Sequence, residues 1–157
     1  MANFVYNIAK GRVVELYNRV DSNDPANSAI VIVAINTSAT DAALKDLDTL
    51  AAIEADGNTA EVTNSGYARK VLTDADLAAY SVNDASDLID LVLTNQTWTA
   101  VAAGTAWTDL VICYDPDTTA GTDANIIPLT CNDFAITPDG SDIIADLTTN
   151  GFFRAAE

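Results

Sequence analysis

The residues best suited to chemistry gather in one acidic loop, YDPDTTAGTD, at Tyr114–Asp123. Asp115, Asp117 and Asp123 stand at alternating positions of this loop, together with a threonine and a glycine. Oxygen ligands at alternating positions around a glycine are typical of a calcium loop. The helix–loop–helix calcium pattern fails here, because the glycine comes one residue late and Ile126 stands where a bidentate acid is needed. We therefore expect no metal site and predict an exposed acidic hairpin loop. A looser calcium loop on the three aspartates stays open as the alternative.

Catalytic chemistry has few other candidates in this chain. It contains no histidine, which excludes Ser-His-Asp and Cys-His arrangements. No phosphate-binding glycine loop and no dinucleotide fingerprint is present. Carboxylate pairs such as Asp87 with Asp90, or Asp139 with Asp142, could be proposed as glycosidase acids, but so acidic a chain contains such pairs by chance. We predict that the protein is not an enzyme and uses no cofactor.

The cysteines and tryptophans allow a structural and a functional interpretation. Cys113 and Cys131 lie in apolar, strand-like segments and fit no CxxC pattern, which favours buried small hydrophobes in an intracellular, reduced protein. A disulfide between them stays open. Trp98 and Trp107 are expected in the core of a small β-domain, with a carbohydrate-stacking platform as the alternative.

The charge of the chain is strongly acidic and uneven. Its 23 acids and 7 bases give a net charge of −16, which argues against nucleic acid as a partner. Residues 1–20 carry Lys10, Arg12 and Arg19 against Glu15, a net of 3 − 1 = +2, so the remainder sums to −18. The longest apolar run, Ala29–Ile35, is too short to cross a membrane, and no signal peptide is expected.

Helical periodicity is confined to the first third of the chain. A buried stripe predicts a helix over Ile8–Val20, ended by a proline-containing turn. The continuous β-branched run Ser28–Asn36 predicts a strand buried on both faces. A further short helix is predicted near 41–56, with Asp41 as its N-cap and Gly57 as its stop.

Short apolar runs alternate with turn clusters after Gly57, which predicts a series of strands. These are Tyr67–Thr73, Asp87–Leu93, Gln96–Ala102, Thr108–Tyr114, Asn125–Phe134, Ser141–Leu147 and Gly151–Ala155. Pro138–Gly140 and Asn150–Gly151 predict tight hairpins.

The predicted fold class is α+β and mainly β: an antiparallel β-sandwich or barrel with an N-terminal helix and one further short helix. Residues 1–24 are expected to form an N-terminal arm or helix. Residues 25–157 are expected to form a single mainly-β domain.

The order of motifs along the chain carries a resemblance. The motifs are NIAKGRVVELYNRV, NDPANSAIVIV, GYARKVLT, QTWTA, YDPDTTAGTD, IIPLTCNDFAITPDGSD and GFFR, and they cover nearly the whole sequence. In this order the chain resembles a family of small structural proteins encoded among the head genes of tailed bacteriophages. None of the motifs is catalytic.

The resemblance implies a virion component at the capsid surface, made in the host cytoplasm, and favours a capsid decoration, or cement, protein. Its implied partners are the major capsid protein and other copies of itself, in a homotrimer or another small cyclic oligomer. The apolar and locally basic N-terminal segment, with Phe4, Tyr6, Lys10 and Arg12, is the expected contact. The alternatives are a tail, baseplate or head-fibre component, and a carbohydrate- or calcium-binding β-module.

Overall fold

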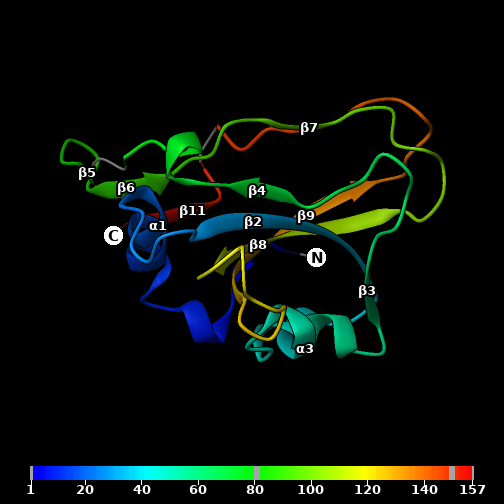
Figure 1. The fold of residues 1–157 in the computed structure, drawn as a ribbon, viewed down its shortest axis with the longest axis horizontal. Helices are drawn as coiled ribbons and strands as arrows, with labels where there is room; N and C mark the ends of the chain where they lie inside the picture. Colours follow the sequence, from blue (N-terminus) through cyan, green and yellow to red (C-terminus); the bar gives the residue numbers. More distant parts are fainter. Residues whose placement is uncertain (1, 80–81, 149–150, 157) are drawn as a thin grey trace.

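The computed structural model describes residues 2–79, 82–148 and 151–156. Strands make up 34% of the chain and helices 17%, and the sheets are antiparallel, so the protein is mainly β as predicted (Figure 1). The helical elements are η1 (Asn7–Ala9), α1 (Val13–Asp21), α2 (Asp41–Lys45), α3 (Leu50–Ala55) and η2 (Asp74–Asp76). The strands are β1 (Phe4–Val5), β2 (Ala29–Thr37), β3 (Thr59–Glu61), β4 (Lys70–Leu72), β5 (Val82–Asn83), β6 (Leu88–Leu91), β7 (Gln96–Trp98), β8 (Trp107–Asp115), β9 (Ile127–Ile136), β10 (Ile143–Ala145) and β11 (Phe153–Ala156).

The main sheet has the strand order β1-β9-β8-β2-β3, and β4 also pairs with β2. Its two central strands, β2 and β8, are buried along almost their whole length. Helix α3 lies on one side of this sheet and the β7 segment on the other (Figure 1). A strand covered on both faces must be apolar at successive positions, which explains the run AIVIVAI and confirms the predicted strand.

The second layer is an interrupted two-stranded ladder. β7 pairs with β10, the backbone N–H of Leu93 donates to the carbonyl of Leu147 at 3.2 Å, and further along β6 pairs with β11. Trp98 from this layer and Trp107 from the main sheet meet edge to face, with ring centroids 5.2 Å apart. Both indoles are buried, so the predicted core role is confirmed and a carbohydrate-stacking platform is excluded.

The N-terminal helix is shorter than predicted. Gly11 adopts a φ of +78°, a left-handed conformation that breaks the helix between η1 and α1. The predicted stripe is nevertheless the buried face of α1: Val13, Leu16, Tyr17 and Val20 are all covered. The hydroxyl of Tyr17 also donates to the carbonyl of Ala78 at 2.7 Å, which ties α1 to the segment that follows η2.

The N-terminal segment belongs to the body and is not a separate arm. Strand β1 pairs with β9, in the register Phe4 to Cys131. Phe4 is 9% exposed and Tyr6 is 0% exposed, and their rings meet edge to face inside the core. Phe4 and Tyr6, two of the four residues expected at a partner contact, thus have their rings buried in the chain's own core, where burial stabilises this fold.

The region near 41–56 contains two short helices where one was predicted. The hydroxyls of Thr40 and Thr49 cap them, each accepting a hydrogen bond from a backbone N–H three residues on. The predicted cap, Asp41, lies in the first turn of α2 instead. A second threonine cap in the middle of the apolar pattern is the local signal that starts a new helix.

The two predicted hairpins do not form between neighbouring strands. Gly140 turns with a φ of +100°, as its sequence indicates, but it joins β9 of the main sheet to β10 of the second layer. Asn150 lies outside the described residues, and β10 and β11 pair with β7 and β6 rather than with each other. The predicted turn at Gly140 is therefore confirmed, whereas the predicted pairing of the strands on either side of it is wrong.

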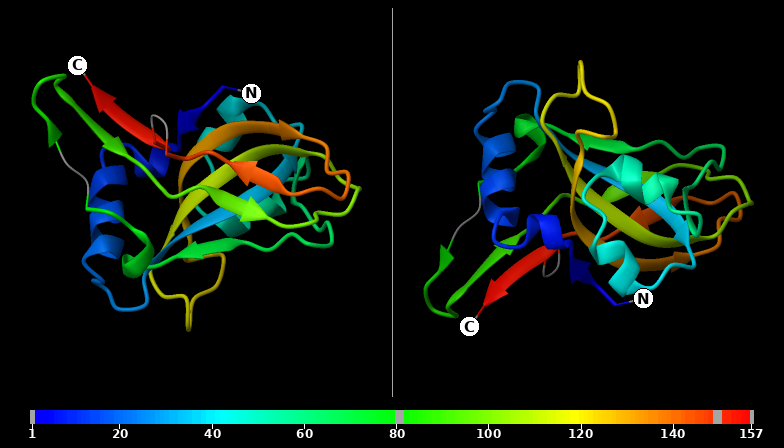
Figure 2. Two further views of the ribbon diagram at one scale, coloured as in Figure 1. Left: turned by 90° about the horizontal axis from the view of Figure 1, so that it is seen from above. Right: turned by 90° about the horizontal axis from the view of Figure 1, so that it is seen from below.

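A three-stranded ribbon projects from one end of the molecule. Its strand order is β11-β6-β5, and both views of Figure 2 show it extending past α1. Gly151 precedes β11 and has a φ of +64°. A Cβ at this position would come within 2.1 Å of the carbonyl oxygen of Leu91. Only glycine allows this close approach, which fixes the point where the ribbon leaves the body.

Candidate functional site

The first half of the acidic loop is held by its own side chains. Asp115 is buried at the end of β8, and its carboxylate accepts from the backbone N–H of Asp117 at 3.0 Å. The Asp117 carboxylate accepts from the backbone N–H and the hydroxyl of Thr119, at 2.9 and 2.6 Å. A Cβ at Gly121 would lie 2.7 Å from the carbonyl oxygen of Asp117, so the late glycine serves a tight turn. In these contacts each aspartate carboxylate accepts a hydrogen bond from the backbone N–H two residues further along the chain, which is typical of aspartate turns.

The third candidate of this loop points elsewhere. The carboxylate of Asp123 contacts the guanidinium of Arg69, with Nη1 and Oδ1 2.6 Å apart. Asp115, Asp117 and Asp123 therefore do not converge on one point. Over the part of the chain that the structure describes, no group of three or more His, Cys, Asp or Glu side chains could hold a metal ion.

Arg69 is the centre of the densest charged cluster in the described residues. Its Nη2 lies 2.6 Å from a carboxylate oxygen of Glu54 on α3 and 2.6 Å from one of Glu61 on β3. Asp123 supplies the third carboxylate, and the hydroxyl of Tyr67 donates to Glu61 at 2.8 Å. We call these four charged residues the Arg69 cluster. It joins α3, β3, the segment before β4 and the β8–β9 loop, which are far apart in the sequence.

Three carboxylates around one guanidinium leave the cluster with excess negative charge. Burial raises the pKa of Glu54 to about 7; the Arg69 guanidinium opposes this shift, and the neighbouring Asp123 and Glu61 carboxylates add to it. The pKa of Glu61 lies below its ordinary value, because hydrogen bonds from Arg69 and Tyr67 outweigh its burial. Hydrogen bonding to Arg69 likewise lowers the pKa of Asp123. The cluster therefore takes up a proton on Glu54 near neutral pH, which lets the three acids share one cation.

Sequence reasoning missed this cluster. Its only local signal is one arginine within GYARKVLT, a segment of an otherwise acidic chain. The acids that Arg69 contacts are set by strand pairing. β2 pairs with both β3 and β4, which brings Glu61 and Arg69 together. Each of the three carboxylates contacts Arg69, so the cluster holds four segments of the chain together.

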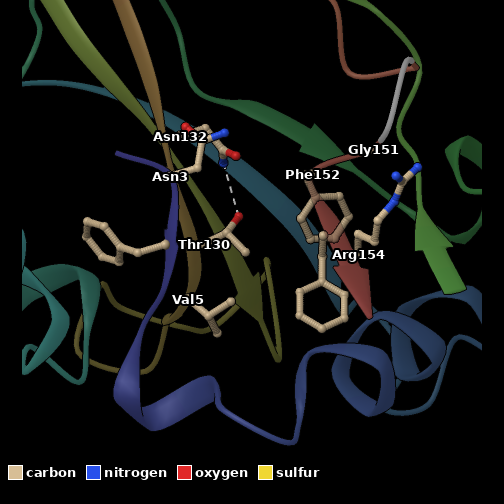
Figure 3. A pocket seen from close by; sticks show the side chains of 9 residues that line it. Asn3, Val5, Thr130, Asn132, Gly151, Phe152 and Arg154 are labelled. Carbon is tan, nitrogen blue, oxygen red and sulfur yellow. Dashed lines mark hydrogen bonds between the residues drawn. The ribbon is translucent and has the colours of Figure 1, made fainter. Parts of the chain in front are cut away.

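A shallow hollow of about 270 Å³ lies between the N-terminal and C-terminal strands (Figure 3). Its walls come from β1, β9 and the start of β11, and its floor is largely apolar, with Val5 and Phe152 among the lining residues. The amide of Asn132 donates to the hydroxyl of Thr130 at 3.1 Å. Among the described residues that line it there is no acid–base pair, and the one charged group, Arg154, forms an ion pair with Asp90. These described residues therefore form a concave surface without a pair of groups for acid–base catalysis.

A second hollow, of about 310 Å³, lies on the projecting ribbon. In the ribbon, Val82 faces Ile89 on the next strand, and Ile89 faces Ala155 on the third. Residues in register share a face of a sheet, so these three side chains form one apolar row. Val82 is 57% exposed, and Asp87 is the charged residue among those that line the hollow. We call this surface the ribbon hollow.

The basic side chains of the N-terminal segment remain accessible. Lys10 follows η1, is exposed, and its ammonium donates to the side chain of Asn7 at 2.6 Å. Arg12 and Arg19 both lie near Glu15, at 3.8 and 2.9 Å. Of the four predicted contact residues, Lys10 and Arg12 thus keep the exposure that a contact requires.

A buried acid in the main sheet was also missed. Asp109 on β8 is almost fully covered, and neither carboxylate oxygen has a hydrogen-bond partner among the described residues. Burial raises its pKa, which favours the neutral acid. Nearby, Cys113 and Cys131 are free and buried, which confirms their prediction as small core residues. Burial raises the pKa of both thiols, so neither is a reactive thiolate.

Comparisons with known proteins give no relative for this chain: no family model matches it, and neither the curated proteins nor the solved structures contain a significant match. No helix within the described residues has the length and apolar character of a membrane span.

Proposed function

We propose that this protein is a structural component of a bacteriophage virion, and specifically a capsid decoration protein that binds the outer surface of the shell. The resemblance in motif order is the first support, since it covers nearly the whole chain and includes no catalytic motif. The proposal places the protein at the capsid surface, with the major capsid protein as its partner.

The observation that carries the proposal is the division of the molecule into a packed body and an uncovered ribbon. In the body, charged groups are engaged with one another, as in the Arg69 cluster. On the ribbon, an apolar row that includes Val82 lies open to solvent. A protein that works by contact needs this combination: a rigid support and an apolar surface whose burial drives association.

The charge of the chain suits the same role. At a net charge of −16, long-range repulsion between copies opposes non-specific aggregation, which helps to keep a protein made in high copy number soluble. Binding to the assembled shell would then stabilise that shell by mass action, since any ligand of the assembled form alone shifts the equilibrium towards it.

Particles of the phage that encodes this chain test the proposal. Quantitative mass spectrometry of purified virions should find a copy number comparable to that of the major capsid protein. Particles assembled without the protein should lose infectivity at a lower temperature than particles that contain it. Its absence from mature virions would overturn the proposal, and a few copies per particle would favour a tail, baseplate or head-fibre component.

A further inference from the structure

The ribbon hollow combines an apolar surface with a negatively charged side chain. The described residues that line it are apolar apart from Asp87, an exposed residue whose backbone adopts a φ of +49°. Asp84 lies in the same turn and is also exposed. A group that fills this hollow must therefore combine an apolar stem with a positive end, which is the chemistry of a lysine side chain.

The rest of the chain supplies few cations that could fill this role. Five of its seven bases are already engaged: Arg12, Arg19, Arg69 and Arg154 with carboxylates, and Lys70 with the ring of Trp98. A sixth, Lys45, lies over the ring of Phe4. Lys10 is the remaining base, and its ammonium donates to the neutral side chain of Asn7.

Lys10 is also presented outward. It stands between η1 and Gly11, whose φ of +78° makes a corner there, and it is exposed. No residue of η1 or α1 lines the ribbon hollow, so the chain's own N-terminal segment does not cover it. The complementary surfaces are thus both open on the same molecule without meeting each other.

We propose that a second copy of this chain occupies the ribbon hollow, inserting Lys10 so that its aliphatic stem lies along Val82 and Ile89 and its ammonium reaches Asp87. Each copy then donates an N-terminal segment and accepts one on its ribbon. Such a head-to-tail contact closes into a ring when the rotation between copies allows it. This inference stands apart from the capsid proposal, because it concerns the isolated chain and needs no particle.

Sedimentation of the purified chain tests this contact. We expect the average mass to rise above the 16.5 kDa of one copy as the concentration approaches about 1 mM, the range in which weak contacts form. Val82→Asp, which puts a charge in the hollow, should abolish the rise. Ile144→Asp is the matched control, because Ile144 is an equally exposed apolar residue, 60% exposed, on β10 outside the ribbon; it should associate like the unchanged chain.

Charge reversal distinguishes this contact from non-specific association. Lys10→Glu and Asp87→Lys should each weaken association by about tenfold or more, because each creates a like-charge pair. An equimolar mixture of the two variants should regain it, because every contact between unlike copies again joins opposite charges. Circular dichroism melts of each variant check that the fold is kept, and both substituted positions are exposed.

Cross-linking supplies an independent readout on the unchanged chain. A carbodiimide, which joins an amine directly to a carboxylate, should link Lys10 of one copy to Asp87 of another. Mixing isotopically light and heavy chains identifies this link as intermolecular. A chain that remains at 16.5 kDa throughout, a Val82→Asp variant that associates normally, or a mixture of charge variants that regains nothing would each overturn the proposal.

Discussion

The body and the projecting ribbon are both antiparallel sheet, yet they are stabilised differently. In the body, β2 lies between β8 on one side and β3 and β4 on the other, and every one of its residues except Asn36 is buried. In the ribbon, only Leu91, at the base of β6, is fully buried, while β5 and most of β11 are exposed. A three-stranded sheet needs a covered apolar face to be stable by itself. The ribbon therefore depends on the body for its position and leaves apolar surface for another molecule.

The largest expected effect comes from truncating the body. Ile32→Ala at the centre of β2, a fully buried position, should lower the free energy of unfolding by about 2–5 kcal/mol. Val82→Ala on the ribbon should lower it by less than about 1 kcal/mol, since an exposed side chain leaves no cavity. Urea denaturation followed by circular dichroism measures both. Equal losses at the two positions would contradict the difference between body and ribbon.

The same contrast appears in two arginines. Arg69 contacts three carboxylates and its side chain is 27% exposed, whereas Arg154 on the ribbon pairs with Asp90 and is 44% exposed. Arg69→Met should destabilise the protein by about 2–3 kcal/mol, somewhat below the cost of breaking a fully buried pair, because three acids lose their cation. Arg154→Met, the matched control, should shift the urea midpoint much less. A larger shift for Arg154→Met would place the important ion pair on the ribbon.

The Arg69 cluster also predicts a pH dependence. The pKa of Glu54 in the folded protein is about 7, above its ordinary value of 4.5, so between these values the folded state holds a proton that the unfolded state releases. Its contribution to stability is therefore present in full below about pH 4.5 and is lost as the pH rises through 7. Glu54→Gln, which resembles the protonated acid, should melt at a more nearly constant temperature between pH 5 and pH 8.

A control variant isolates this effect from the net charge of the chain. Glu15→Gln removes an acid from the exposed face of α1, with the same change in formal charge. It should retain the decrease in melting temperature from pH 5 to pH 8. If the melting temperature of Glu54→Gln falls as steeply from pH 5 to pH 8 as that of Glu15→Gln, Glu54 does not hold the proton.

The smallest expected effect concerns calcium. The acids of the Tyr114–Asp123 loop are already engaged, Asp117 with Thr119 and Asp123 with Arg69. A melt in calcium and a melt in EDTA should therefore give the same midpoint. A site saturated at 100 times its dissociation constant would add about 2.7 kcal/mol, so a clear rise in calcium would show that the loop rearranges to bind it.

Much of the body could be predicted from the sequence, because its signals are local. The continuous apolar run of β2 and the buried stripe of α1 each follow from a period that the neighbouring residues carry. The core positions of both tryptophans and both cysteines follow from residue type and strand context. Spacing alone showed that the acidic loop departs from the helix–loop–helix calcium pattern, and in the structure the carboxylates of its three aspartates have different partners.

The remaining features depend on long-range pairing, which a single sequence does not specify. The turn at Pro138–Gly140 has the composition of a hairpin, yet it carries the chain between two sheets. Phe4 was expected at a partner contact because its segment is apolar and locally basic, but pairing with β9 buries it. The Arg69 cluster joins residues from four segments, and the ribbon has two short strands whose pairing with β6 defines it. Each of these outcomes is decided by which strands meet.

A map of the intact phage particle tests the central proposal most directly. If the protein is a capsid decoration protein, density of the size of this body should repeat over the outer surface of the shell, at sites set by the capsid lattice. The ribbon and the N-terminal segment should lie at the contacts between neighbouring densities or with the shell, and the acidic remainder should face solvent. A bare shell, or density for this chain confined to the tail, would contradict the proposal.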